Sequence, residues 1–408
     1  MGVVQAGQQQ VDVDRYLDDP RCLSDSLSAI RSTGGHALCH CTAPPRRLVV
    51  RKVGAKFFLA VWPDDGPNHD FACAFYRQVH EAAQGASEPD RDAGDEATKF
   101  TPAFALQRAP DAPRRQVSEA GQATDPHAGA DAVSVTALLN MLWAGSRLNC
   151  WAPRWTRDWW RVRREIYRSI DQWELGGLPM SSQLYVPLPF RRDAANDAAE
   201  REWSQFVSDL AHHRNAVPRR LLLSEVKSLE RSSFGFKLDL KHVPWPVFMS
   251  REQWEHLQAC YARALAGISR QSSPQVKLVA LVLIEAAASG KHYFAMCEAA
   301  MIMTNANWVP AHTTAELRLA DHLVDQQRAF TRPMGADDAA PATPDFWLHD
   351  AAGDKPLAIE VLGVDAVPYR ERKLRRAALL REHGHPTWVW DATSEDPLLP
   401  PVHREAKP

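Results

Sequence analysis

The spacing of apolar residues predicts helices in the first half of the chain. Leu138 and Leu142 recur at helical spacing behind Ser134, a residue type that favours helix N-caps. Two further helices are expected over 156–173 and 194–212. Because the three segments follow one another closely, we expect them to pack together as a helical domain.

The second half of the chain alternates between extended and helical patterns. Phe236, Leu238 and Leu240 alternate with other residues, as in a strand with one buried face, and the apolar run 277–284 is typical of a buried strand. Such alternation predicts a mixed α/β sheet. Strands are expected over 221–223, 234–240, 277–284, 292–296, 346–348, 357–362 and 387–390, and helices over 252–268, 314–329 and 369–383.

Composition divides the chain further. Residues 1–20 are polar, and we expect a loose tail there. Residues 84–131 have linker composition and, apart from a short strand near 100–104, bury too little apolar surface to offset their ordering entropy. We therefore predict an α+β multidomain protein. Its parts are a small N-terminal module over 21–83, a disordered linker over 84–131, a helical and in one version winged-helix-like domain over 132–218, a mixed α/β domain over 219–308, and a further α/β domain over 309–394.

Length, composition and charge exclude several classes of protein. A chain of 408 residues with 45% apolar and 24% charged residues suits two to four globular domains. A formal charge of −2 rules out a uniformly basic surface, although a local basic face stays possible. No apolar run approaches the roughly 20 residues of a membrane-spanning helix. Seven cysteines without a secretory signal indicate reduced thiols in a cytoplasm. The fingerprints of nucleotide hydrolases, zinc proteases and serine hydrolases are missing.

Cysteine and histidine residues form two close pairs near the N-terminus, Cys39 with Cys41 and His69 with Cys73. Residues 48–62 between them predict a β-hairpin, which would return the chain so that the two pairs meet. Four such ligands suit a tetrahedral Zn²⁺ ion, and a closed four-ligand site is structural. We predict a structural zinc site, in which Cys22, His36 or His40 could replace one ligand. The alternative is a set of buried reduced cysteines with surface histidines.

Tryptophan and arginine residues are concentrated in the segment 151–168. Trp151, Trp155 and Trp159 recur at four-residue spacing. A helix carrying them would present an aromatic stripe and a basic flank that suits a phosphate backbone. The stronger alternative is that the tryptophans belong to the core and the arginines to a solvated face. The candidate DNA contacts are Arg157, Arg161 and Arg164.

Carboxylates dominate the chemistry of the last hundred residues. Asp345 and Glu360 belong to two strands that can lie side by side, and Glu316 lies on the preceding helix. Carboxylate oxygens suit Mg²⁺ or Mn²⁺, and such an ion can activate water and stabilise the charge of a reacting phosphodiester. The alternative is that Asp345 is a turn residue and Glu360 a partnered buried carboxylate.

The helix expected after these strands, 369–383, is rich in arginine. Its Arg372, Arg375 and Arg376 could hold a phosphate backbone beside the metal.

This stretch resembles the core of the PD-(D/E)xK nuclease superfamily over about a hundred residues. The shared features are a helix with Glu316, then strands with Pro344-Asp345 and Glu360, then a helix and a strand. The resemblance implies a restriction-endonuclease-like α/β core and metal-binding roles for the three carboxylates. The chain departs from the pattern at Leu362, where the superfamily usually has a lysine. Lys373 on the following helix could supply that charge, and without it the site would bind metal weakly or not at all.

Nearly the whole chain outside the linker is similar to domain-of-unknown-function family 1173. The stretches that carry this similarity are LLNMLW, LLLSEVKSLE, AELRLADHLVDQQRAFTRP, PDFWL and IEVLG, together with the C-x-C and H-x-x-x-C pairs. The resemblance implies a bacterial protein encoded mostly on plasmids and integrative conjugative elements. It supplies no activity, but it favours a DNA-related role.

We therefore expect a metal-dependent DNA endonuclease or a nuclease-like DNA-processing protein of a mobile genetic element. Its expected partners are DNA and proteins of a conjugative or integrative element. The alternative is a non-catalytic, zinc-containing accessory protein that binds DNA or protein with a degenerate nuclease fold. A third possibility is a pure scaffold, which would show no salt-sensitive DNA binding.

Overall fold

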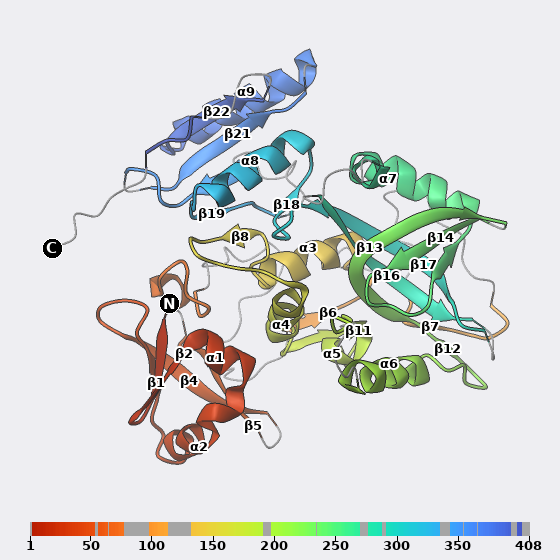
Figure 1. Cartoon of the computed structure of the whole chain (residues 1–408), viewed down its shortest axis with the longest axis horizontal. Helices are drawn as coiled ribbons and strands as arrows, with labels where there is room; N and C mark the ends of the chain where they lie inside the picture. The colour runs from red at the N-terminus through yellow and green to blue at the C-terminus, as the bar shows by residue number, and fades with distance from the viewer. Residues whose placement is uncertain are drawn as a thin grey trace. The chain divides into compact units, whose positions relative to one another are not determined.

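The fold comes from a computed structural model that describes residues 2–53, 56–63, 65–76, 98–112, 132–190, 197–233, 235–269, 276–287, 291–334, 343–353, 355–364, 366–392 and 398–401. The chain divides into two compact units, Met1–Asp90 and Arg91–Pro408. Figure 1 colours both along the sequence.

The first unit is a five-stranded antiparallel sheet with short helices. Its strand order is β2-β1-β3-β4-β5, and the pair β4–β5 is the predicted hairpin. The strands are β1 (Val3–Ala6), β2 (Gln9–Asp12), β3 (Ala37–Cys39), β4 (Arg46–Val53) and β5 (Lys56–Val61); the helices are α1 (Val13–Asp18) and α2 (Ser24–Ser32), with 3₁₀ turns at Pro20–Leu23 and Gly66–Asn68.

The expectation of a loose tail over residues 1–20 was wrong. Val4 and Ala6 of β1 are fully buried, and β1 pairs with both β2 and β3. Tyr16 of α1 is also buried, and its hydroxyl accepts a hydrogen bond from the Leu59 N–H at 2.7 Å. Val4 and Ala6, which flank Gln5, are too short a pattern to reveal a strand that its neighbours complete.

The second unit contains a helical layer joined by short strands. Helix α3 (Val135–Gly145) begins at Ser134 as predicted, because the Ser134 Oγ accepts a hydrogen bond from the Ala137 N–H. The other helices of this layer are α4 (Trp159–Ser169), α5 (Met180–Gln183) and α6 (Asp197–Asp209); the short strands are β6 (Thr98–Phe100), β7 (Gln107–Arg108), β8 (Cys150–Trp151), β9 (Trp173–Leu175), β10 (Leu178–Pro179), β11 (Leu184–Tyr185) and β12 (Val217–Pro218). Of the expected linker, only 98–112 is described, and the remaining residues of 84–131 lie outside the described ranges.

The tryptophans of 151–160 do not form one helical stripe. Trp151 lies in β8, and α4 begins only at Trp159, with Asp158 as its N-cap. Both of these tryptophans are buried, so their packing follows the core alternative. Pro153 is incompatible with a helix continuing through this segment, and the Asp158 carboxylate accepts from the Arg161 N–H at 2.8 Å.

The strands β13 to β17 form a closed ring, seen edge-on in Figure 1 with α7 beside it. Strand β13 pairs with β16 over its first half and with β14 over its second, and β15 and β17 complete the ring. The bounds are β13 (Arg220–Ser232), β14 (Gly235–Leu240), β15 (Val247–Met249), α7 (Arg251–Ser269), β16 (Lys277–Ala286) and β17 (Phe294–Thr304); β18 (Pro310–Ala311) adds to β17.

The last sheet has the order β22-β21-β20-β19-β8, in which only β21 and β22 are parallel. The side chains of Ile359 and Val361 pack with α8 in one core, whereas Glu360 on the opposite face contacts α9. Figure 1 shows β21 between these helices. The bounds are α8 (Thr314–Asp325), β19 (Phe330–Thr331), β20 (Phe346–Leu348), β21 (Leu357–Leu362), α9 (Val367–Glu382) and β22 (Thr387–Asp391).

No helix in the described parts of the chain combines the length and the apolar character that crossing a membrane requires. The fold is a mixed α+β architecture, as the alternating pattern predicted.

The buried His349 predicts a pH dependence of stability in the last sheet. Its Nε2 lies 2.9 Å from the Thr331 Oγ1, and burial lowers the pKa of His349 to about 4. Since the unfolded chain takes up this proton near pH 6.5, the contribution is present above that pH and is lost as the pH falls toward 4, at most about 3 kcal/mol. Urea unfolding at pH 7.5 and pH 5 should show a smaller difference in His349→Gln than in the wild type. The exposed His213, changed to Gln, is the control, and an equal difference in all three proteins would contradict the prediction.

Candidate functional site

Four predicted zinc ligands lie together in the first unit. Cys39 ends β3, Cys41 follows it, and His69 and Cys73 lie in the turn after the Gly66–Asn68 segment. Their ligand atoms are all within 4.8 Å of one another, and Cys39, His69 and Cys73 are buried. The hairpin β4–β5 returns the chain between the two pairs, as predicted. This group could hold a metal ion such as zinc.

The spacing of these atoms fits a zinc tetrahedron. Zn–S and Zn–N bonds of about 2.3 and 2.0 Å imply edges of about 3.5 to 3.8 Å. The Cys39 Sγ lies 3.6 Å from the Cys73 Sγ, and the His69 Nδ1 lies 3.2 Å from the Cys41 Sγ and 3.7 Å from the Cys73 Sγ. The donors present, three sulfurs and one imidazole nitrogen, therefore match the ion in both kind and spacing.

The possible substitute ligands are engaged elsewhere and do not belong to this group. The His36 ring packs edge-on against Trp62, and the His40 Nε2 lies 2.8 Å from the Gln5 Oε1. Cys22 lies in the Pro20–Leu23 turn and is likewise outside the group.

Crowding separates the pKa values of the three thiols. Hydrogen bonds with Cys41 and Cys73 raise the pKa of Cys39, and the same kind of contact lowers the pKa of Cys41. At Cys73, a hydrogen bond from Cys39 lowers the pKa, but Cys41 and burial outweigh it and raise the pKa to about 11. Three adjacent thiolates repel one another, so a cation among them would stabilise the fully deprotonated state.

The predicted carboxylates Asp345 and Glu360 meet the predicted Lys373 in the second unit. The Lys373 Nζ contacts both oxygens of Asp345 and lies 3.3 Å from the Glu360 Oε2. Arg376, one helical turn further along α9, joins them through 2.5 and 2.8 Å contacts to Glu360 and a 2.8 Å contact to Asp345. We call these four residues the carboxylate cluster.

Burial gives the carboxylate cluster its electrostatic character. Glu360 is fully buried, and Asp345 and Lys373 are less than a tenth exposed. Burial alone would raise the pKa of Asp345, but the charges of Lys373 and Arg376 hold it below its ordinary value. At Glu360, burial prevails over the hydrogen bond from Arg376 and raises the pKa to about 7. The two carboxyl groups share two cations and titrate as a coupled pair.

Glu316 lies at the same end of the sheet but does not join this cluster. Its carboxylate accepts hydrogen bonds from the His312 N–H at 2.9 Å and the Thr313 hydroxyl at 3.2 Å, at the start of α8. A 3.4 Å contact with the buried Arg332 completes its surroundings. Among the described residues, Glu316, Asp345 and Glu360 do not form a group of ligand atoms close enough together to hold a metal ion. Glu316 lies in the first turn of α8, which Thr313 caps.

Gly363 allows α8 to begin beside β21. A Cβ at this position would lie 2.7 Å from the Ala315 Cβ, so any side chain would push the first turn of α8 away. Tyr369 adds a further contact, because its hydroxyl donates to the Val361 carbonyl at 3.2 Å. Sequence reasoning missed Tyr369, as well as His312 and Arg332, because their contacts come from segments far apart in the chain.

The predicted DNA-contacting arginines have different surroundings. The Arg157 guanidinium donates to the carbonyls of Leu148, Asn307, Arg147 and Cys150, which makes it part of the fold rather than an open cation. Arg164 pairs with Glu165, and Arg161 donates to Thr156. Arg372 and Arg375 are exposed on α9, whereas Arg376 belongs to the carboxylate cluster. DNA contact by these residues stays a prediction.

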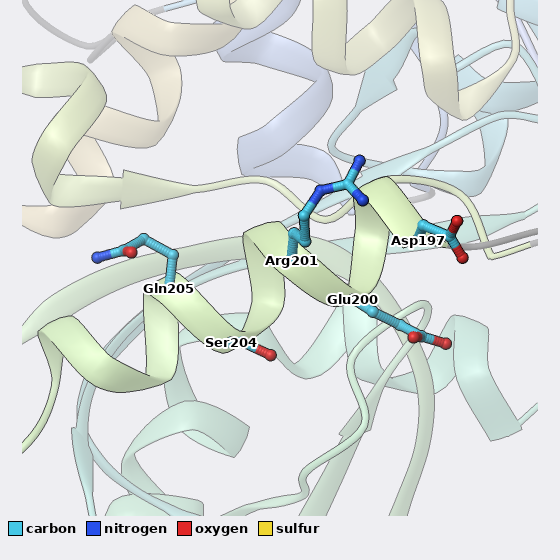
Figure 2. Close-up of a pocket in the computed structure, with 5 residues that line it drawn as sticks. All are labelled: Asp197, Glu200, Arg201, Ser204 and Gln205. Atoms are coloured by element: carbon cyan, nitrogen blue, oxygen red, sulfur yellow. The ribbon is translucent and has the colours of Figure 1, made fainter.

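A surface pocket lies along α6 and contains none of the predicted site residues. Figure 2 shows its side chains spread along one helix, with Arg201 and Glu200 pointing to different sides. The lining residues are Asp197, Glu200, Arg201, Ser204 and Gln205. The chemically distinctive groups are instead the Cys/His group and the carboxylate cluster.

The fold and these groups define a mixed α+β protein with a possible Cys/His metal site. The chain belongs to the family described as protein of unknown function (DUF1173), whose model matches residues 14–393. No curated protein and no solved structure matches it.

Proposed function

We propose that the carboxylate cluster is the centre of a divalent-metal-dependent DNA nuclease. The observation that carries the proposal is the position of Lys373. Its ammonium reaches Asp345 and Glu360 from α9, so a lysine is present although Leu362 occupies the usual place on the strand. A buried lysine between two carboxylates suits phosphodiester chemistry better than a purely structural role, because buried ion pairs contribute little net stability.

The donors fit Mg²⁺ or Mn²⁺ in kind, since Asp345 and Glu360 present hard carboxylate oxygens. Positive charge already occupies their neighbourhood, because Arg376 bridges both carboxylates. The Arg376 side chain is 19% exposed, whereas the Lys373 side chain is only 7% exposed. When bound, the ion would supply charge for the reacting phosphate and activate a water molecule. Lys373 would orient that water, and Asp345 and Glu360 would hold the ion.

The biological setting is part of the same proposal. We place this activity in a bacterial mobile element, in the cytoplasm, with DNA and proteins of a conjugative or integrative element as partners. The chain belongs to the DUF1173 family, and the support for this setting is what the sequence resemblance to that family implies, an origin on plasmids or integrative elements.

Cleavage of DNA by the purified full-length protein tests the proposal. Single- and double-stranded DNA are incubated with Mg²⁺ or Mn²⁺, and Asp345→Asn should lower the cleavage rate at least about a hundredfold. Mutation of residues that only orient a metal ligand already lowers metal affinity or activity by about 10- to 100-fold, and loss of a ligand should cost more. Asp325→Asn changes an exposed carboxylate of α8 and serves as the matched control. Cleavage that persists in Asp345→Asn would assign the activity to another site or a contaminant.

A second candidate is a non-catalytic accessory protein with a degenerate nuclease fold. The observation that favours it is Arg376, which together with Lys373 already neutralises both carboxylates. In that case no divalent ion supports cleavage of any substrate, and Asp345→Asn leaves DNA binding unchanged.

A further inference from the structure

The closed ring of β13 to β17 has a specific topology. Following the hydrogen bonds around it gives the order β13-β14-β15-β17-β16 and back to β13, with β15 and β17 parallel and every other pair antiparallel. In chain order, helix α7 falls between the third strand, β15, and the fourth, β16. Strand β13 pairs with β16 over its first half and with β14 over its second, and a bulge between Val226 and Ser228 lies where the pairing with β14 begins. This order, with the helix in that place, is that of the OB-fold, a five-stranded Greek-key barrel.

Apolar side chains fill the interior of the barrel, so a ligand would have to bind on its outer surface. Leu222, Leu238, Val282 and Met301 belong to one buried apolar cluster, which also takes in Leu257 of α7. Gly235 shows how tightly the ring closes, because a Cβ there would lie 2.2 Å from the Met249 carbonyl oxygen. A small barrel is filled by its own side chains.

The outer side of the barrel differs from strand to strand. Outward residues of β13, β16 and β17, such as Leu223, Leu281 and Ala300, are buried in the cluster that contains Leu138 and Leu142 of α3. On β14 and β15, in contrast, Lys237 and Phe248 are cross-strand neighbours that remain partly exposed. The helical layer therefore covers one side of the barrel and leaves the side of the second and third strands accessible.

One pair of aromatic rings, Phe248 and Tyr293, marks the accessible side. A second pair lies beside it, but its Trp245 also packs against Trp203 of α6 and Phe294 of the interior cluster. The Phe248 ring meets Tyr293 edge-on at 5.3 Å, and the Trp245 ring stacks on His292 at 4.9 Å with only 9° between their planes. Both pairs join the same two segments, the entry to β15 and the entry to β17. Phe248, Tyr293 and Trp245 are half-buried, and His292 is exposed. Planar rings held in this way can accept further planar groups by stacking.

Lysines accompany these rings. Lys291 is exposed beside His292. Lys237 is shared between Glu230 at 3.2 Å and Asp239 at 2.9 Å, and Lys241 pairs with Glu225. A phosphate would have to exchange with these carboxylates, so the charge supports binding that is moderate and sensitive to salt.

We propose that the outer face of β14 and β15, together with the entry to β17, binds single-stranded nucleic acid. Bases stack on Phe248 and Tyr293, and phosphates meet Lys237, Lys241 and Lys291. This site goes beyond the proposed nuclease centre, because it shares no residue with the carboxylate cluster. The second- and third-strand face is also where OB-fold barrels hold oligonucleotides.

Fluorescence anisotropy of a labelled oligothymidine with full-length protein tests the site, without added divalent cations. Phe248→Leu and Tyr293→Leu should each weaken binding about five- to a hundredfold, the range for loss of one base–aromatic stack. Leucine keeps the packing apolar, and unchanged urea unfolding would show that each variant folds. Trp160→Ala removes an exposed ring of α4 and is the matched control. With three phosphates engaged, log Kd should change with log salt by a slope of about 2.

The outcomes test oligonucleotide binding by the barrel independently of the proposed nuclease activity. Binding that survives in Asp345→Asn and weakens in Phe248→Leu supports the barrel site whether or not the protein cleaves DNA. Binding that weakens in Trp160→Ala but not in Phe248→Leu would move the contact to α4 and overturn it. Equal affinity for duplex DNA, absence of oligothymidine binding, or binding of an oligosaccharide in its place would also overturn it.

Discussion

Removal of the metal from the first unit is expected to unfold that unit and leave the second unit folded. Structural zinc contributes apparent binding free energies of about 10–16 kcal/mol in small domains, whereas whole domains are stable by only about 5–15 kcal/mol. Four ligands come from two distant segments, so without the ion three crowded thiols and His69 must pack against one another. In the described part of this unit, a single small core around Leu27 and Leu48 remains to hold the fold without the ion.

Elemental analysis and hydrogen exchange measure this effect. Protein purified without chelator should carry about one zinc ion per chain, and chelation should remove the exchange protection of the described residues 2–53, 56–63 and 65–76. Cys73→Ser should do the same, whereas Cys260→Ser, an exposed cysteine of α7, should retain both metal and protection. A metal content near zero, or full protection in Cys73→Ser, would contradict the structural zinc site.

Breaking the carboxylate cluster is expected to produce the largest loss of stability in the second unit. Lys373→Met removes one of two cations that face Asp345 and Glu360, and a buried charge left without its partner costs about 3–5 kcal/mol. Part of this loss should return in the double variant Lys373→Met with Asp345→Asn, because the unpaired carboxylate is then gone. The two changes are therefore non-additive.

Urea unfolding of the two single variants and the double variant measures this coupling. Lys355→Met is the matched control, since Lys355 is exposed and donates to the Gly384 carbonyl at 3.2 Å. Its loss should stay below about 1 kcal/mol. Equal losses in Lys373→Met and Lys355→Met would show that the cluster is solvated and would weaken the argument for a buried centre.

Much of the local structure could be predicted from the sequence. The N-cap at Ser134, the hairpin between the two ligand pairs and the strands of Asp345 and Glu360 are encoded by neighbours within a few residues. Hydrophobic periodicity and turn-forming residues act through neighbours in the chain, so these features can be predicted from the sequence alone. The Cys/His ligands were found in the same way, because each pair spans a single turn.

Other features required the folded chain. The strand at Val4 was missed because a two-residue apolar signal gains its meaning from the neighbouring strands. The hydrogen-bond partners of Arg157 and Arg376 could not be predicted from the sequence for a related reason. An arginine's partners come from distant segments, so the same residue type is an open cation in one place and a buried donor in another.

The sequence by itself determined many of the helices and strands, which Cys and His residues pair as possible metal ligands, and that Asp345 and Glu360 come from neighbouring strands. Only the tertiary structure decided that β13 to β17 close into a barrel, that Lys373 contacts the carboxylates from α9, and that Glu316 contacts His312 and Arg332 instead of joining them. The physical reason is the range of the interactions. Elements arise from contacts between residues close in the chain, whereas strand order and buried ion pairs depend on contacts that no local pattern encodes.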